Sequence, residues 1–134
     1  MASGTNYPRR SQVFPPVNSA VPAARHWAHK VLDDWGMAAS DAELALNELI
    51  SNAVVHGSGD IRADLIDLGS GIRIEVHDHG GSAPRFHRRA SDNYPGGRGL
   101  DIINRVSTTW GWRRPEPGGT TVWAVVPRAP FAAG

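Results

Sequence analysis

The sequence contains no cysteine. This absence excludes disulfide bonds, thiolate zinc sites and cysteine nucleophiles. Long apolar runs are also missing: no segment approaches the ~20 apolar residues that a membrane-spanning helix needs, and residues 1–22 hold no apolar stretch of signal-peptide length. We therefore expect a soluble, cytoplasmic protein that makes no membrane contact.

A large charge of either sign is lacking as well. The chain has 14 basic and 13 acidic residues, which gives a net charge of +1, and all the basic residues except Lys30 are arginine. This balance by itself neither indicates nor excludes a nucleic-acid surface. Because the arginines form only short pairs and no basic stripe, we expect no nucleic-acid partner.

What is present is enough for one folded domain. The chain has 134 residues, of which 40% are apolar, so it can bury one hydrophobic core. We place the domain at residues 11–128. Residues 1–10 are polar and predicted to be disordered, and residues 129–134 form a C-terminal tail.

Three segments have the periodicity of helices. Ser19 is expected to open the first helix, whose apolar face repeats every three or four residues until Gly36. Ser40 and Glu43 form a capping-box pattern for the second helix, which runs to about His56. Its core stripe is predicted to be Leu46, Leu49, Ile50 and Ala53. The third helix is expected to begin at Gly99.

Five segments have strand character: 12–14 (at an edge), 61–68, 72–77, 108–113 and 120–126. Residues 69–71, Gly-Ser-Gly, predict a hairpin turn. The stretch 78–97 is a long loop for a small domain, and such loops are often functional. The order predicts an α/β (α+β) two-layer sandwich with helices on one face of a mostly antiparallel mixed sheet. The five tryptophans are expected in the core.

The second helix carries the first candidate site. Glu48 and Asn52 are four residues apart, so they project from the same side of the helix and lie off its core stripe. An amide oxygen can ligate Mg²⁺, and a carboxylate can accept a proton from a nucleophile. On its own, such a pair is also typical of a solvated helix face.

Asp78 is the second candidate. It ends an apolar strand and is followed by His79, Gly80 and Gly81. A carboxylate here can accept a hydrogen bond from an exocyclic amine such as that of adenine, and glycines let a ring approach the backbone. The same pattern is typical of a simple turn. A metal clip formed by His77 and His79 is a further, weaker alternative.

Glycines before a helix form the third candidate. Residues 95–100, Pro-Gly-Gly-Arg-Gly-Leu, lead directly into the expected third helix. Free N–H groups at a helix N-terminus bind phosphate, and Arg98 adds a positive charge. A flexible glycine hinge would produce the same pattern.

Together these elements resemble the sequence boxes of GHKL (Bergerat-fold) ATP-binding domains. The boxes are ELALNELISNAVVHG, IEVHDHGGSAP, GGRGLDIINRVSTTWGW and GGTTVWAVVP, and they extend over about residues 19–127. The first box is similar to that of the bacterial anti-sigma-factor serine/threonine kinases.

The resemblance implies a role for each matching residue. Asn52 would hold Mg²⁺ and Glu48 would be the general base. Asp78 and Gly80 would contact adenine, with support from Thr120. The phosphates of ATP or ADP would lie against Gly97, Arg98, Gly99 and Leu100, and residues 81–96 would be the ATP lid. It also implies an antagonist protein as phosphate acceptor, a sigma factor as partner, and a homodimer.

Two departures from the family pattern are present. Ser82 stands where the first glycine box usually has its second glycine, which affects the expected lid hinge more than adenine recognition. No phosphate-accepting histidine segment precedes the first box, which argues against a sensor histidine kinase. A non-catalytic, ATP-dependent protein-binding module and a slow ATPase remain as alternatives, because one fold serves many functions.

Overall fold

The computed structural model describes residues 6–38, 40–81, 99–114 and 118–128. The described elements occur in the order that the sequence predicts. They are β1 (Arg9–Phe14), α1 (Ala20–Asp34), α2 (Ser40–His56), β2 (Ile61–Asp67), β3 (Gly71–Asp78), α3 (Gly99–Val106), β4 (Thr109–Arg113) and β5 (Thr120–Pro127).

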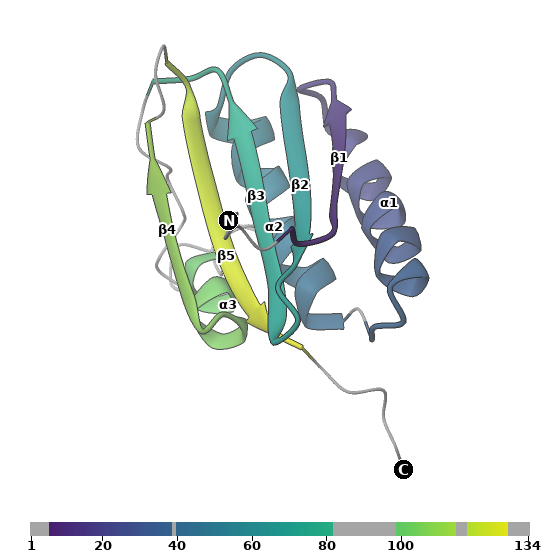
Figure 1. Ribbon diagram of the computed structural model, residues 1–134. Coiled ribbons are helices and arrows are strands. Elements are labelled where there is room, and N and C mark those ends of the chain that lie inside the picture. The colour runs from purple at the N-terminus through teal and green to yellow at the C-terminus, as the bar shows by residue number, and fades with distance from the viewer. Residues whose placement is uncertain (1–5, 39, 82–98, 115–117, 129–134) are drawn as a thin grey trace.

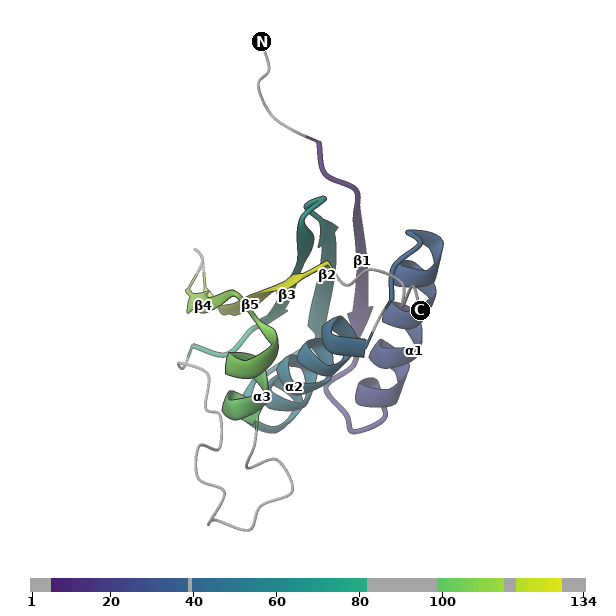
Figure 2. The ribbon, with the colours of Figure 1, turned by 90° about the horizontal axis from the view of Figure 1, so that it is seen from below.

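The five strands form one sheet in the order β1-β2-β3-β5-β4, and every neighbouring pair is antiparallel. All three helices lie on one face of this sheet, as Figures 1 and 2 show. The expected two-layer sandwich is therefore confirmed. β1 is an edge strand, as predicted, although it begins at Arg9, inside the segment expected to be disordered.

The core lies between the sheet and the helices. Alternate residues of each strand point toward the helices. On that side of the sheet, the odd-numbered apolar residues of β2 lie beside the even-numbered ones of β3, which in turn lie beside the even-numbered ones of β5. Helix α2 packs against α1, α3, β2, β3 and β5, which makes it the central helix. Its predicted core stripe is confirmed: Leu46, Leu49, Ile50 and Ala53 are each at most 4% exposed.

Two details of the helix ends differ from the expectations. Ser19 does precede α1, but its side chain makes no capping hydrogen bond and its backbone is already helical. The capping box at α2 depends on the Ser40 side chain, which lies outside the described residues. The Glu43 carboxylate lies 2.7 Å from Nδ1 of His29 and so joins α2 to α1.

The tryptophan expectation was wrong for two of the five. Trp27, Trp35 and Trp110 pack against the core, but Trp112 is 43% exposed. Trp123 lies on the face of the sheet without helices, where the Arg73 guanidinium stacks 4.4 Å from the centre of its ring. Trp123 differs because residues of a strand alternate between faces and helices cover only one face, whereas Trp112 lies on the same face as Trp110 but is exposed near the end of the edge strand β4. No described helix is both long and apolar enough to cross a lipid bilayer.

Candidate functional site

Helix α2 presents Glu48 and Asn52 beside its core stripe. Both side chains are half-buried, and α3 packs along the same helix. Burial raises the pKa of Glu48, and a hydrogen bond with the Asn47 side chain opposes this rise. A carboxylate whose pKa is raised binds a proton more readily, which suits a general base. Asn47 had not been identified from the sequence.

A second group of predicted residues meets where β3 ends and β5 begins. Asp78 and Thr120 are directly paired across the two strands. The backbone N–H of Gly80 donates to Oδ1 of Asp78 at 2.6 Å, and the Thr120 hydroxyl donates to the carbonyl oxygen of Gly80 at 2.7 Å. The structure thus brings Asp78, Gly80 and Thr120 together, and the turn holds the carboxylate in one orientation.

Two glycines that had no predicted role in the site pack closely against the Asp78 carboxylate and the Asp78 backbone. A Cβ on Gly57 would lie 2.7 Å from Oδ2 of Asp78 and 2.6 Å from the carbonyl oxygen of Ala53. A Cβ on Gly119 would lie 2.6 Å from the carbonyl oxygen of Asp78, and Gly119 has a φ of 97°. Only glycine fits either position without a shift. Gly57 in particular places the C-terminal end of α2 directly against Asp78.

The connection after α2 is tied to the same turn. The backbone N–H of His79 donates to the carbonyl oxygen of Ser58 at 2.7 Å. This hydrogen bond fixes the end of the helix that carries Glu48 and Asn52 relative to the strand that carries Asp78. The two predicted halves of the site are therefore joined through the backbone.

The glycine segment is only partly described. Gly99 and Leu100 begin α3, as expected, and α3 packs against α2. Gly97, Arg98 and the expected ATP lid, residues 81–96, lie outside the described residues except for Gly81. Their predicted contacts with phosphate remain predictions.

Substituting Gly57 with alanine tests the contact between α2 and Asp78. The new methyl group must displace a short carboxylate or a backbone carbonyl, and neither can move as a flexible side chain does. We expect nucleotide affinity to fall at least tenfold and the free energy of unfolding to fall by about 1–3 kcal/mol. Isothermal titration with Mg-ATP and urea denaturation measure the two effects.

Gly69→Ala is the matched control for Gly57→Ala. Gly69 has a φ of 85° in the β2–β3 turn, and a methyl group added there would meet no other atom within 4 Å, so alanine strains the backbone without touching the site. It should lower stability and leave nucleotide affinity unchanged. Parental nucleotide affinity in Gly57→Ala would contradict the proposed role of this contact.

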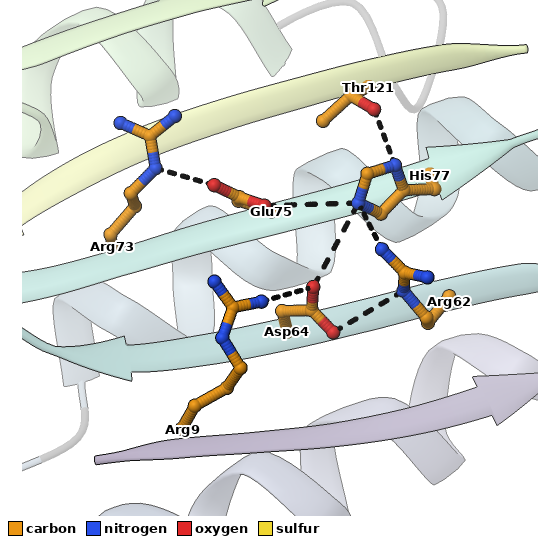
Figure 3. Close-up of polar contacts among 7 residues, drawn as sticks. All are labelled: Arg9, Arg62, Asp64, Arg73, Glu75, His77 and Thr121. Atoms are coloured by element: carbon orange, nitrogen blue, oxygen red, sulfur yellow. Dashed lines mark hydrogen bonds and ion pairs between the residues drawn. The ribbon is translucent and has the colours of Figure 1, made fainter. Parts of the chain in front are cut away.

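A separate polar network covers the face of the sheet without helices. Asp64 and Glu75 are directly paired across β2 and β3, and they are only 1% and 7% exposed. Figure 3 shows the arginines and the histidine around them. Arg9 bonds to Asp64 at 2.9 Å, and Arg73 bonds to Glu75 at 2.6 Å. His77 lies between the two carboxylates on one side and Thr121 on the other.

The network predicts a pH dependence of stability. The His77 side chain, followed by the Arg73 guanidinium, lowers the pKa of Glu75 to about 2, against the opposing effect of burial. The ordinary value is 4.5. Glu75 therefore stabilises the fold fully above pH 4.5, and this contribution is lost as the pH falls from 4.5 through 2.

Urea denaturation of Glu75→Gln and the parent at several pH values measures this contribution. The parent should be more stable than the variant at about pH 6, and the difference should shrink between pH 4.5 and pH 2. Asp33→Asn, at an exposed position of α1, is the control and should show no such convergence. A difference that stays constant over this whole range contradicts the assignment.

The side chains of the predicted nucleotide site, on α2 and at the end of β3, fit a nucleotide and a hard cation. Asp78 supplies an acceptor held by Gly80, and a Cβ on Gly57 or Gly80 would press against this carboxylate. Asn52 supplies an amide oxygen, a ligand type that Mg²⁺ accepts together with phosphate and water. Glu48 lies one helical turn away as a carboxylate with a raised pKa.

Comparison with known families agrees with this arrangement. The family model of the histidine kinase-like ATPase domain matches residues 14–126, which is most of the chain. The match begins at the last residue of β1 and ends within β5, so it includes both halves of the site. A search of curated proteins gives no match.

Proposed function

The chain belongs to the histidine kinase-like ATPase family, and from this membership we propose that it is a protein serine/threonine kinase of the anti-sigma-factor type. In this proposal it transfers the γ-phosphate of Mg-ATP to a hydroxyl of a small antagonist protein. Family membership supports ATP binding. The kinase activity, the acceptor and the sigma factor belong to the proposal.

One observation carries the proposal furthest: Glu48 and Asn52 occur together on the edge of α2, and Glu48 has a raised pKa. A module that only bound ATP would need a metal ligand but no base. The retention of a half-buried carboxylate, whose charge is disfavoured by burial, is best explained by a chemical task. The similarity of residues 43–57 to the first box of the anti-sigma kinases supports the same conclusion.

The proposed mechanism assigns a separate task to each residue. Asp78 accepts a hydrogen bond from the adenine amine, while Gly80 and Thr120 hold the turn that orients it. Asn52 would ligate Mg²⁺, which when bound neutralises charge on the phosphates. Glu48 accepts the proton of the attacking hydroxyl as the bond from its oxygen to the γ-phosphorus forms, while the bond between the γ-phosphorus and the β–γ bridging oxygen breaks and ADP leaves.

The alternative is an ATP-dependent binding module that holds a protein partner without phosphorylating it, or a slow ATPase. The exposed Trp112 at the end of β4 and the helix-free sheet face leave surface for a partner in either case. These alternatives differ from the proposal in where the γ-phosphate goes. It stays on ATP in the binding module, passes to water in the ATPase, and passes to a protein hydroxyl in the kinase.

The test is to incubate the protein with Mg²⁺ and γ-labelled ATP, with and without the antagonist proteins encoded in the same genome. Label on an antagonist that survives acid treatment and is released by alkali identifies phosphoserine or phosphothreonine and supports the kinase. Released inorganic phosphate without labelled protein indicates an ATPase. Tight ATP binding with neither product, over all candidate acceptors, indicates the binding module and overturns the proposal.

A further inference from the structure

Asp64 and Glu75 form a pair of buried carboxylates on the helix-free face of the sheet, and the nucleotide site does not use them. Two carboxylates directly opposite one another on one face of a sheet repel, and both are almost fully buried. Such a pair is stable only if positive charge lies close to it, and Arg9 and Arg73 each supply a guanidinium to one carboxylate, at Oδ2 of Asp64 and Oε2 of Glu75. Oδ1 of Asp64 is buried and has no hydrogen-bond partner among the described residues.

The gap between the carboxylates and His77 has the dimensions of a metal site. Nε2 of His77 lies 3.8 Å from Oδ2 of Asp64 and 3.8 Å from Oε1 of Glu75, and one ligand atom from each residue lies within 4.8 Å of the others. In a tetrahedral site with bonds of about 2.1 Å, neighbouring ligand atoms are roughly 3.4 Å apart. The two distances from Nε2 exceed this spacing by about 0.4 Å each, and the separation of the ligand oxygens of Asp64 and Glu75 is at most 4.8 Å, so a small inward movement of the side chains would close the site around an ion.

The orientation of the His77 imidazole is fixed through the ring nitrogen that points away from the carboxylates. Nδ1 of His77 is hydrogen-bonded to the hydroxyl of Thr121, which is fully buried. Metal-binding histidines usually have their second ring nitrogen held in this way, because the contact fixes both the ring and its tautomer. The arrangement leaves Nε2 directed toward the carboxylates, as Figure 3 shows.

Arg62 now occupies part of this gap. Its Nη2 lies 2.8 Å from Nε2 of His77, and its Nε lies 3.5 Å from Oδ1 of Asp64. A guanidinium has only donors, so the ring nitrogen accepts with the lone pair that a metal would use. The Arg62 side chain is 51% exposed and borders a hollow of about 370 Å³ that His77 also lines, so there is room for it to move away.

From these contacts we propose that Asp64, Glu75 and His77 form a transition-metal site of the Zn²⁺ class, in which the metal and the Arg62 guanidinium compete for one position. Two carboxylates and one imidazole suit Zn²⁺, whereas Mg²⁺ rarely takes an imidazole. The site lies on the opposite face of the sheet from α2. It is therefore separate from the Mg²⁺ position expected at Asn52.

The test is a Zn²⁺ titration of the full chain, produced without a histidine tag and freed of metal with a chelator. Isothermal titration should give one equivalent of bound Zn²⁺, and Zn²⁺ but not Mg²⁺ should raise the melting temperature in the absence of nucleotide. His77→Ala and Glu75→Gln should each lower the Zn²⁺ affinity at least tenfold. His29→Ala removes another histidine next to a carboxylate and should change nothing.

Arg62→Met provides the outcome that a purely structural network does not predict. It removes the competing cation from a half-exposed position, so Zn²⁺ affinity should rise about tenfold even if His77→Ala folds poorly. The proposal is overturned if neither the parent nor Arg62→Met binds one equivalent of Zn²⁺. It is equally overturned if folded His77→Ala binds Zn²⁺ as the parent does, or if Arg62→Met binds it no more tightly.

Discussion

Replacing Glu48 with glutamine is expected to lower phosphoryl transfer to a protein acceptor by roughly 10²–10⁴-fold, the usual contribution of a general base. Glutamine keeps the shape of the side chain but cannot accept the proton. The affinity for Mg-ATP should be nearly unchanged, because the base acts on the attacking hydroxyl and not on the bound nucleotide. Single-turnover transfer and equilibrium ATP binding measure the two quantities.

The same variant should be at least as stable as the parent at neutral pH. Burial raises the pKa of Glu48, so its ionised form is less favourable in the folded chain than in the unfolded one. The free energy of unfolding therefore falls as the pH rises above 4.5 through the raised pKa, and glutamine removes this loss. A fall in activity without a fall in stability distinguishes a chemical role from a structural one.

Glu43→Gln is the matched control on the same helix. Glu43 pairs with His29 on α1, away from the Asp78 end of the helix, so the change should leave phosphoryl transfer at the parental rate. Transfer by Glu48→Gln at the parental rate would falsify the assignment of the base.

Asn52→Ala should instead weaken Mg-ATP binding itself, because Asn52 is the expected metal ligand.

Local patterns were sufficient to predict most of the fold. The stripe of α2 follows from the 3.6-residue period, and the β2–β3 hairpin follows from Gly69 between two alternating runs. Asp78, Gly80 and Thr120 were predicted as site residues, and the structure brings them together. Motif order carried this prediction, since no single motif distinguishes a site from a turn.

Features that depend on strand register and packing could not be predicted in the same way. The pairing of Asp64 with Glu75 requires knowing which residues of β2 and β3 lie opposite each other. The roles of Gly57 and Gly119 depend on atoms far away in the sequence, and a glycine after a helix is explained equally well as a helix stop. Trp112 is exposed near the end of an edge strand, a position that composition alone does not reveal.

Asp78→Asn is expected to weaken ATP binding by about 1.5–3 kcal/mol, or roughly 10- to 150-fold, while leaving the fold intact. In the parent, the backbone N–H of Gly80 donates to Oδ1 of Asp78. In the variant, the side-chain carbonyl oxygen of asparagine can still accept this hydrogen bond. The amide nitrogen must then replace Oδ2, beside Gly57. A donor would stand where the adenine amine requires an acceptor, and two donors repel.

The nucleotide preference should change in the same variant. In the parent, the Asp78 carboxylate should favour ATP over GTP, because it attracts the adenine amine and repels the guanine carbonyl. Asparagine presents an N–H instead, so the discrimination between ATP and GTP should shrink or reverse. Competition between the two nucleotides for the protein measures the preference without depending on the amount of active material.

Asp60→Asn is the control for this experiment. Asp60 is an exposed carboxylate at the same end of the sheet, just before β2, so the variant makes the same change in net charge. It should leave both ATP affinity and the preference over GTP at parental values. If Asp78→Asn also keeps both values, Asp78 does not contact the base, and the hydrogen bonds of Gly80 and Thr120 serve only to hold the end of β3 against β5.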